Sequence, residues 1–284
     1  MTILVTGASG HLGRLIVESL LARGAAPTDI VAGARTVEKA ADLAEKGVRV
    51  VPLDYDDPHS VAAALEDVDT VALVSGSEVG KRFQQHSAVI DAAVAAGVGK
   101  LIYTSLTRAT ESPLVLAPEH VQTEQAIRAS GLPYVILRND WYSENYAQDL
   151  AAAAQSGEVT ASVGDARVAS ASRRDFAEAV AVVALEDGHI DTTYELAGDV
   201  AWDYDDLAAA MGEVLGREVV YRRIDTAAQI ALLTSFGLDE GTAGFVAALD
   251  AGIAAGALDS DDTTLSRLIG RPTTPLVEAL RTLV

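Results

Sequence analysis

Cysteine is absent from the 284 residues, and long apolar runs are missing as well. Without cysteine there are no thiol nucleophiles, cysteine-bound zinc sites, iron–sulfur clusters or disulfides, so redox chemistry would require a bound cofactor. No apolar run approaches the roughly 18 residues that a membrane span needs, and the opening segment 1–6 lacks the basic leader of a signal peptide. We therefore expect a cytoplasmic protein without a membrane span.

Basic residues are also in short supply, with 21 Lys and Arg against 41 Asp and Glu. The formal net charge of −20 repels phosphate backbones, so nucleic acid is not expected as a partner. An anionic cofactor would need local cations. The acidic surplus by itself also serves solubility and indicates no particular function.

A strand, a glycine-spaced turn and a helix follow one another at the start of the chain. The apolar segment 3–5 leads into three glycines at intervals of three residues, and an amphipathic stretch follows at once. Glycine permits positive φ and close backbone approach, while the N–H groups and dipole of the helix face anionic phosphates. The pattern predicts a dinucleotide pyrophosphate site. Its expected residues are Gly7, Ser9, Gly10, His11, Leu12 and Gly13.

Strand and helix signals alternate through the first half of the chain. After the first unit, strands are predicted at 30–35, 48–53, 70–74, 100–104 and 133–137, and helices at 37–46, 57–65, 83–96 and 118–130. Repeated βα units with short connections imply a parallel sheet covered by helices on both faces. The predicted fold class is therefore α/β, a doubly wound parallel sheet.

The second half has a different character, with alanine-rich helices and short strand candidates at 168–170, 193–197 and 219–224. A helix at 175–185 is expected to return to the first domain. The predicted division is a cofactor-binding domain of residues 1–140 plus about 166–187, and a smaller, mixed substrate-binding domain of about 141–165 plus 188–284.

The end of the second strand indicates which dinucleotide binds. An NAD site usually has an acidic residue there that bonds to the ribose, but this chain has Arg35 and no acid. A guanidinium can bind a 2′-phosphate, which a carboxylate would repel, so NADP(H) is favoured. The alternative is that Arg35 is only a solvated surface residue. Asp54, after the third strand, is expected either at the adenine edge or as a cap for the following turn.

The ends of strands four to six should border the nicotinamide, because ligands of open α/β sheets lie beyond the carboxyl ends of the strands. The first of these ends carries Ser75, Gly76 and Ser77. The last is followed by Trp141, Tyr142 and Tyr146, three of only fourteen aromatic residues. Such a cluster suits a flat apolar ligand, although it could equally anchor the second domain.

The Tyr-x-x-x-Lys pair of classical short-chain dehydrogenases is missing, since no tyrosine is followed four places on by lysine. His120 and Glu124 stand at the expected helix instead, on one helical face. They could form a proton relay or merely a solvated helix face. No other residues stand at a spacing typical of metal ligands, so a metal site is not supported. A quinone needs less general-acid help than a simple ketone, so the missing pair favours a quinone acceptor.

Several blocks of the sequence together resemble the bacterial NADPH-dependent quinone oxidoreductases of the NmrA-like, atypical short-chain dehydrogenase branch. These blocks are 7–13, 75–80, 103–106, 119–120, 137–146, 194–199 and 268–274. The resemblance implies a Rossmann domain with a small C-terminal domain, NADPH at the glycine turn and Arg35, and a quinone in the cleft between domains. It also implies cofactor contacts from Asn139, Trp141, Tyr142, Ser143 and Arg173.

Direct hydride transfer from NADPH to a quinone, without flavin, is the predicted function. Ser105, His120 and Tyr142 are the candidate groups at the acceptor. Two alternatives stay open: a non-catalytic NADP-binding redox sensor, which would also lack the tyrosine–lysine pair, and a carbonyl reductase. The expected partner is a small quinone, and a homodimer is left open.

Overall fold

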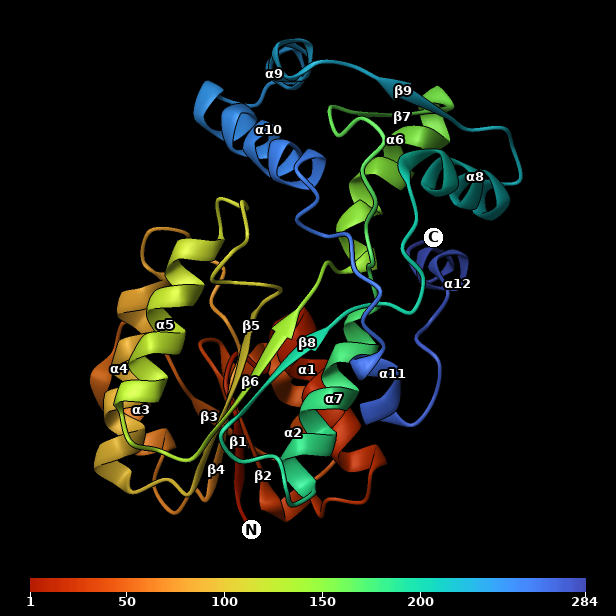
Figure 1. Cartoon of the computed structure of the whole chain (residues 1–284). Helices are drawn as coiled ribbons and strands as arrows, with labels where there is room; N and C mark the ends of the chain where they lie inside the picture. Colours follow the sequence, from red (N-terminus) through yellow and green to blue (C-terminus); the bar gives the residue numbers. More distant parts are fainter. The chain divides into compact units, whose positions relative to one another are not determined.

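Seven strands of the computed structural model, which describes residues 1–284, form one sheet (Figure 1). Their order across the sheet is β3-β2-β1-β4-β5-β6-β8. The bounds are β1 Ile3–Val5, β2 Ile30–Ala34, β3 Arg49–Pro52, β4 Thr70–Leu73, β5 Lys100–Leu106, β6 Tyr134–Asn139 and β8 Thr192–Leu196. The paired strands from β3 to β6 run parallel. The doubly wound α/β prediction is confirmed, and β1 lies at the point where the winding reverses.

Helices cover both faces of this sheet (Figure 1). One face carries α3 Pro58–Ala64, α4 Arg82–Ala96 and α5 Ala117–Ala129, and the other carries α1 His11–Ala22, α2 Ala41–Glu45 and α7 Arg173–Leu185. The helix predicted at 37–46 is divided into the 3-10 turn η2 Val37–Ala40 and α2, and a second such turn, η1 Pro27–Asp29, precedes β2. The apolar faces of the helices and the buried strands supply most of the core, so hydrophobic burial fixes the layers.

Helices α1 and α7 pack against each other on one face of the sheet. Ile16, Val17 and Leu20 of α1 are fully buried. Helix α7 is buried on most of its surface and rich in alanine, with Phe176 as its one large aromatic side chain. Small side chains let two helices approach closely, so the returning segment forms part of the first core rather than a flexible connection.

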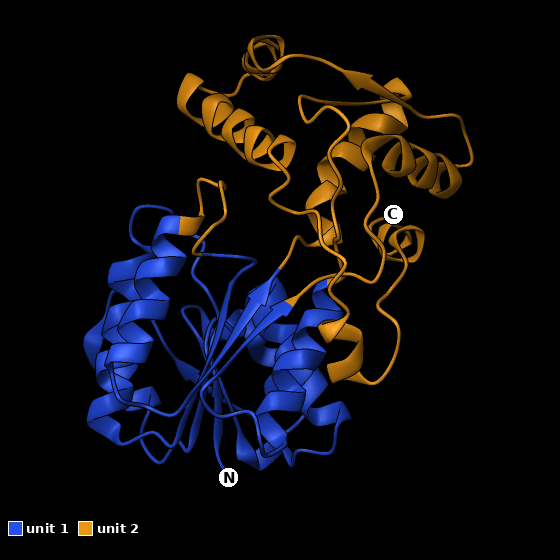
Figure 2. Ribbon diagram, in the orientation of Figure 1, with its two compact units in different colours: residues 1–109, 118–139, 173–195 blue, residues 110–117, 140–172, 196–284 orange.

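Contacts divide the chain into two units (Figure 2). The N-terminal unit contains residues 1–109, 118–139 and 173–195, and the C-terminal unit contains 110–117, 140–172 and 196–284. The segment that returns to the N-terminal unit thus runs from 173 to 195, where the sequence suggested about 166–187. It extends further toward the C-terminus because it includes most of a strand as well as a helix.

That strand, β8, corrects one prediction. The candidate at 193–197 was assigned to the substrate-binding region, yet β8 is the seventh strand of the main sheet, beside β6. The Asp191 N–H bonds to the Tyr134 carbonyl at 2.7 Å, and the Asp140 N–H bonds to the Leu196 carbonyl at 2.8 Å. The first bond joins the beginnings of β6 and β8, and the second joins their ends, so β8 is parallel to β6. Helix α7 is therefore the crossover of a further βα unit.

The C-terminal unit combines a parallel pair of strands with several helices (Figure 2). Its elements are η3 Ser143–Tyr146, α6 Ala147–Ser156, β7 Glu158–Ala161, α8 Tyr204–Leu215, β9 Val220–Arg223, α9 Thr226–Ser235, α10 Glu240–Ala254, α11 Thr264–Ile269 and α12 Leu276–Arg281. Strand β9 confirms the candidate at 219–224, whereas the sequence did not reveal β7. No helix of the chain has the length and apolar character needed to cross a membrane.

The strand expected at 168–170 does not form. Val168 exchanges backbone hydrogen bonds with Trp202, the Ala169 N–H bonds to Leu258, and Ala171 bridges to Tyr142. The backbone groups of this apolar segment are satisfied by three separate segments, so no continuous ladder develops. Burial alone therefore gave a misleading strand signal here.

Candidate cofactor and active site

The glycine turn joins β1 to α1 with the geometry that a pyrophosphate site requires. Gly7 has φ +60°, and its carbonyl accepts the Gly10 N–H at 2.9 Å. Helix α1 then begins at His11 without a side-chain cap and without an acidic residue in its first turn. The first N–H groups of a helix have no intrahelical acceptor and lie at its positive end. This helix end can therefore receive an anion.

Gly13 shows that the turn is a close-packed cradle rather than a plain loop. A Cβ at this position would press on the Gly7 carbonyl oxygen, and it would lie 2.7 Å from the Gly7 carbonyl carbon and 3.0 Å from the Ala8 Cα. A Cβ on Gly10 would lie 3.2 Å from the same oxygen. Only glycine lets strand, turn and helix approach this closely, so the residues present fit a dinucleotide. In this turn Ser9 is partly exposed and His11 is exposed, whereas Leu12 is buried.

Arg35 and Asp54 follow β2 and β3 at the same edge of the sheet. The Arg35 side chain is 67% exposed, and its Nη1 lies 3.2 Å from Glu78 Oε1. Asp54 accepts the Asp56 N–H on Oδ1 at 3.1 Å, so its carboxylate caps the following turn. Asp54 was expected either at the adenine edge or as a cap for the following turn, and this hydrogen bond is the one that a cap makes. Arg35 keeps a largely solvated guanidinium suited to a phosphate.

The loop after β4 is held at both of its ends. The Gly76 N–H donates to His86 Nε2 at 2.9 Å, and the Gly76 carbonyl accepts Arg82 Nε at 2.8 Å. Arg82 also pairs with Glu119 at 3.0 Å, and the Gly80 N–H donates to the same carboxylate. Ser75 is half-buried, with its N–H bonded to a strand β5 side chain, and Ser77 is exposed. The predicted residues of this loop therefore have defined positions at the sheet edge.

Two histidines are buried beside this loop. Burial lowers the pKa of His86 to about 3, with the positive charges of His120 and Arg82 adding to the effect. Burial also lowers the pKa of His120 to about 3, again reinforced by Arg82. His120 Nδ1 lies 2.8 Å from the hydroxyl of the fully buried Tyr103. Both rings are thus neutral at physiological pH, and His120 has only Nε2 left for a ligand.

The neutral histidines predict an acid-sensitive fold. A group whose pKa is lower in the folded state contributes stability that is complete above its unfolded pKa of about 6.5 and is lost as the pH falls toward the folded pKa. When the pH falls from about 8 to about 5, each ring should lower the free energy of unfolding by on the order of 2 kcal/mol. His120→Gln keeps an acceptor for Tyr103 and should remove its share of this loss in urea unfolding. Replacing the exposed His59 by Gln is the control. If the free energy of unfolding depended on pH equally in the unmodified protein and in both variants, the assignment of His120 as a neutral buried ring would be contradicted.

Glu124 forms a buried ionic network with residues of three strands. Its side chain is 1% exposed, and Arg138 binds it with Nε and Nη2, each at 2.8 Å. The Ser105 hydroxyl donates to Glu124 at 2.7 Å, and Arg128 adds a further contact at 3.0 Å. Burial raises the pKa of this carboxyl, but the bonds from Arg138, Ser105 and Arg128 outweigh it, so the pKa is lowered overall. Glu195 pairs with the same Arg138 at 2.9 Å.

This network bears on the predicted catalytic groups. His120 and Glu124 lie on one face of α5, but the hydrogen bonds of His120 go to Tyr103, while those of Glu124 go to Ser105 and the arginines. The pair therefore does not form the relay considered from the sequence. The Ser105 proton is directed to an ionised carboxylate, so its oxygen is better placed to accept than to donate.

Asn139 and Arg173 mark two further places at this edge. Asn139 is the last residue of β6, is 2% exposed, and accepts the Thr107 N–H on its carbonyl at 2.9 Å. Arg173 is the first residue of α7 and is partly exposed. The N-terminal unit thus brings together the glycine turn, Arg35, Asp54, the β4 loop, Asn139 and Arg173, all at or beyond the carboxyl ends of its strands.

The aromatic block belongs to the C-terminal unit. Trp141 and Tyr142 are partly exposed, whereas Ser143 is fully buried with its hydroxyl 2.9 Å from Ser170 Oγ. Tyr146 packs on Trp202 with ring centroids 5.2 Å apart and is 4% exposed. Tyr146 therefore stabilises the core of this unit, whereas Trp141 and Tyr142 keep part of their surface exposed.

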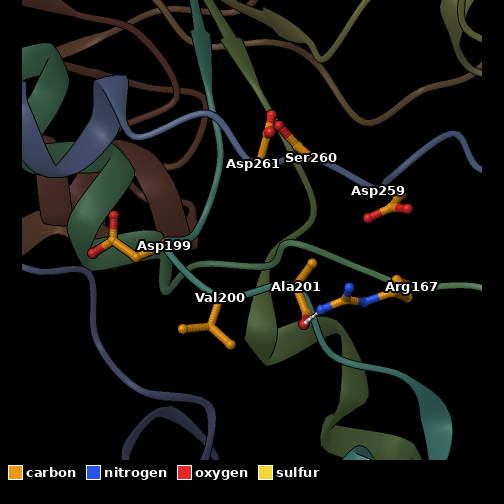
Figure 3. A pocket seen from close by; sticks show the side chains of 7 residues that line it. All are labelled: Arg167, Asp199, Val200, Ala201, Asp259, Ser260 and Asp261. Carbon is orange, nitrogen blue, oxygen red and sulfur yellow. Dashed lines mark hydrogen bonds between the residues drawn. The ribbon is translucent and has the colours of Figure 1, made fainter.

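A pocket of about 450 Å³ also lies in the C-terminal unit (Figure 3). Its lining residues are Arg167, Asp199, Val200, Ala201, Asp259, Ser260 and Asp261. None of the predicted site residues belongs to it. Three carboxylates do not suit a flat apolar acceptor, and Arg167 is engaged with the Ala201 carbonyl. No group of three His, Cys, Asp or Glu side chains in the chain is arranged to hold a metal.

Several site neighbours were not predicted from the sequence. The Tyr55 hydroxyl lies 2.6 Å from Thr6 Oγ1 and 2.9 Å from the Val74 carbonyl, which ties the loop after β3 to β1 and β4. His86 and Glu78 contact residues that are distant in the chain. None of these contacts has a local sequence pattern, and only a three-dimensional pairing of strand ends could have revealed them.

Fold and glycine turn together define a nucleotide-binding protein of the doubly wound α/β class. The chain belongs to the NmrA-like family, whose model matches residues 1–241. This confirms the resemblance drawn from the sequence blocks.

Similar proteins extend over the whole chain. Quinone oxidoreductase 2 of Escherichia coli (strain K12) is 45% identical over 278 residues, which cover 98% of this chain and 97% of that protein. The NAD(P)H azoreductase of Xenophilus azovorans is 30% identical, with 97% and 96% covered.

Solved structures agree with these relatives. The E. coli NADPH-dependent quinone oxidoreductase, in complex with NADPH, has a TM-score of 0.95 at 45% identity, and 99% of each chain is covered. The Citrobacter sp. triphenylmethane reductase, in complex with NADP(H), has a TM-score of 0.94 at 35% identity, with 100% of each chain covered. The similarity therefore includes both units and not only the glycine turn.

Proposed function

We propose that this protein is an NADPH-dependent quinone oxidoreductase that works without flavin. The observation that carries the proposal is the 45% identity to the E. coli quinone oxidoreductase over nearly the full length of both chains. The glycine cradle adds a physical reason, because its close-packed backbone fits a dinucleotide. Bound NADPH would supply a hydride, which together with one proton converts a quinone to a hydroquinone.

The N-terminal unit would hold the cofactor through groups of two kinds. The N-terminus of α1 and the turn Gly7–Gly13 would bind the pyrophosphate, and Arg35 would bind the 2′-phosphate. The anchored loop with Ser75, Gly76 and Ser77 would border the nicotinamide half, together with Asn139 and Arg173. Trp141 and Tyr142 are proposed to complete these contacts, as the family resemblance implies, whereas the fully buried Ser143 would act by fixing this segment through its bond to Ser170.

We expect Arg35→Ala to weaken NADPH binding about 10- to 100-fold and to leave NADH binding nearly unchanged. A charge-assisted hydrogen bond is worth about 1.5–3 kcal/mol, and only NADPH carries the phosphate that would make it. Fluorescence titration with each cofactor gives the two dissociation constants. The exposed Arg49, on β3, provides the control variant Arg49→Ala, which should leave both constants unchanged. Equal losses for NADPH and NADH would place Arg35 outside the 2′-phosphate site.

At the acceptor, His120 is the proposed hydrogen-bond donor. Its Nδ1 is taken by Tyr103 and the ring is neutral, so Nε2–H is the group that could polarise a quinone oxygen. Ser105 and Tyr142 remain proposed neighbours of the acceptor, with Ser105 as a hydrogen-bond acceptor that the Glu124 network orients. Aromatic side chains such as Tyr142 suit a flat ring.

A steady-state assay separates the proposed activity from its alternatives. Purified protein, NADPH and a panel of quinones, ketones and aldehydes should show sustained NADPH loss that depends on quinone. Faster turnover of ketones or aldehydes would identify a carbonyl reductase. Tight NADPH binding without turnover of any acceptor would identify a redox sensor.

Cytoplasmic location and a homodimer are further proposals. An enzyme that consumes NADPH requires access to that cofactor's cytoplasmic pool, which supports the first. Cell fractionation with an antibody to the chain tests the location, and sedimentation equilibrium distinguishes a dimer from a monomer.

A further inference from the structure

An exposed ion pair connects the loops that follow β2 and β4. Arg35 Nη1 and Glu78 Oε1 are 3.2 Å apart, and Lys81 Nζ lies 3.5 Å from the other oxygen of the same carboxylate. Arg35 is the residue proposed to bind the cofactor's 2′-phosphate. In the structure, Arg35 is thus already paired with a carboxylate of the same unit.

The topology places this pair across the cofactor edge. Strand β1 lies between β2 and β4 in the sheet, and the glycine turn begins at the end of β1. A contact between residues that follow β2 and β4 must therefore pass over the end of β1. The Arg35–Glu78 pair consequently lies beside the place where the adenosine half of a dinucleotide would bind.

Glu78 is not at the tip of an unrestrained loop. Gly76 is fixed by Arg82 and His86, and the Gly80 N–H is bonded to Glu119. The Arg82–Glu119 pair behind this loop is itself largely buried. The backbone on both sides of Glu78 is therefore anchored, which keeps its carboxylate within reach of Arg35.

We propose that Glu78 is a specificity-determining residue that competes with the 2′-phosphate for Arg35 and so moderates the preference for NADPH over NADH. A carboxylate beside the guanidinium neutralises part of the positive charge that would otherwise attract the phosphate, and it also repels the phosphate. It does not repel an unphosphorylated ribose, whose hydroxyl groups can donate to it. The proposal rests on the proposed function, since it assumes that Arg35 receives the 2′-phosphate.

The size of the effect follows from the exposure of the pair. Arg35 and Glu78 are 67% and 39% exposed, so solvent screens their attraction. Exposed ion pairs are worth about 0.2–1 kcal/mol, which corresponds to an affinity change of up to about fivefold. Lys81 partly neutralises Glu78 and keeps the effect within this range.

Calorimetric titration with adenosine 2′,5′-bisphosphate and with 5′-ADP tests the proposal without any turnover. In Glu78→Gln, the affinity for the bisphosphate relative to 5′-ADP should rise about two- to fivefold, and added salt should reduce the difference. Glu38→Gln removes the same charge from an exposed position three residues after Arg35, and it should leave the ratio unchanged.

An unchanged or lowered ratio in Glu78→Gln would overturn the proposal, as would an equal rise in Glu38→Gln. Failure of the proposed function is recognised separately, because the unmodified protein would then not oxidise NADPH in the presence of a quinone, whatever its affinity for the two adenosine probes. If the probes bind but Arg35→Ala leaves their ratio unchanged, the competition model is also overturned.

Discussion

Replacing Glu124 by leucine should lower the free energy of unfolding by about 3–5 kcal/mol, because it removes the buried partner of Arg138 and leaves that largely buried guanidinium with only the partly exposed Glu195 as a counter-charge. Arg138 would lose both of its hydrogen bonds to Glu124, and the Ser105 hydroxyl would lose its acceptor. The network joins α5 to β5 and β6, so its loss loosens the edge of the sheet where the acceptor groups lie. Urea unfolding monitored by circular dichroism measures the change.

Two further variants test the origin of this loss. Arg128 is 38% exposed, so Arg128→Ala should cost less than about 1 kcal/mol. Combining Glu124→Leu with Arg138→Met removes both buried charges and should recover part of the stability. Since the pKa of Glu124 is lowered in the folded protein, its contribution should be complete above its unfolded pKa and be lost progressively as the pH falls through its folded pKa. A loss under 1 kcal/mol in the single variant would mean that the network is not a stabilising unit.

Gly13→Ala should destabilise the N-terminal unit by about 3 kcal/mol and weaken NADPH binding at least tenfold. The added Cβ would meet the Gly7 backbone, which cannot rotate away as a flexible side chain can. Separating α1 from the turn would displace the N–H groups that face the phosphates. Urea unfolding and fluorescence titration measure the two effects.

Gly244→Ala is the matched control for this substitution. Gly244 lies within α10, and a Cβ there would meet nothing within 4 Å. The change should be neutral or stabilise the protein by about 0.5–1 kcal/mol through reduced chain entropy. If Gly13→Ala behaved as mildly as this control, the close-packed cradle would not be a requirement of cofactor binding.

Much of the N-terminal unit could be predicted from sequence because its signals are local. Strands β1 to β6 are short apolar runs between turn residues, and the glycine turn identifies itself by spacing and by the helix that follows. Parallel order then follows from the alternation of strands and helices. Arg35 could be predicted as a cofactor residue for the same reason, since its distance from the glycines is set by one βα unit.

Elements whose pairing depends on distant partners were missed or misplaced. Strand β8 carries no mark of the sheet it joins, and the segment at 168–170 looks like a strand although its backbone bonds to three separate places. Strand propensity describes a pleated, half-buried surface and does not name the neighbour. Tertiary packing decided both cases.

The same distinction applies to the site. Residue types at strand ends could be predicted, but their partners could not. His120 and Glu124 share a helical face, yet buried neighbours from other strands take their hydrogen bonds. Whether a titratable group is neutral or ionised depends on burial and on charges that local sequence does not specify.

Stopped-flow mixing of the NADPH-bound, flavin-free protein with a quinone tests the central claim most directly. We expect one equivalent of NADPH to be oxidised per hydroquinone formed, at a rate that depends on quinone concentration, with an intact Arg35 required at low NADPH. A protein that binds NADPH but whose reduced nicotinamide persists across the whole quinone panel would contradict the account.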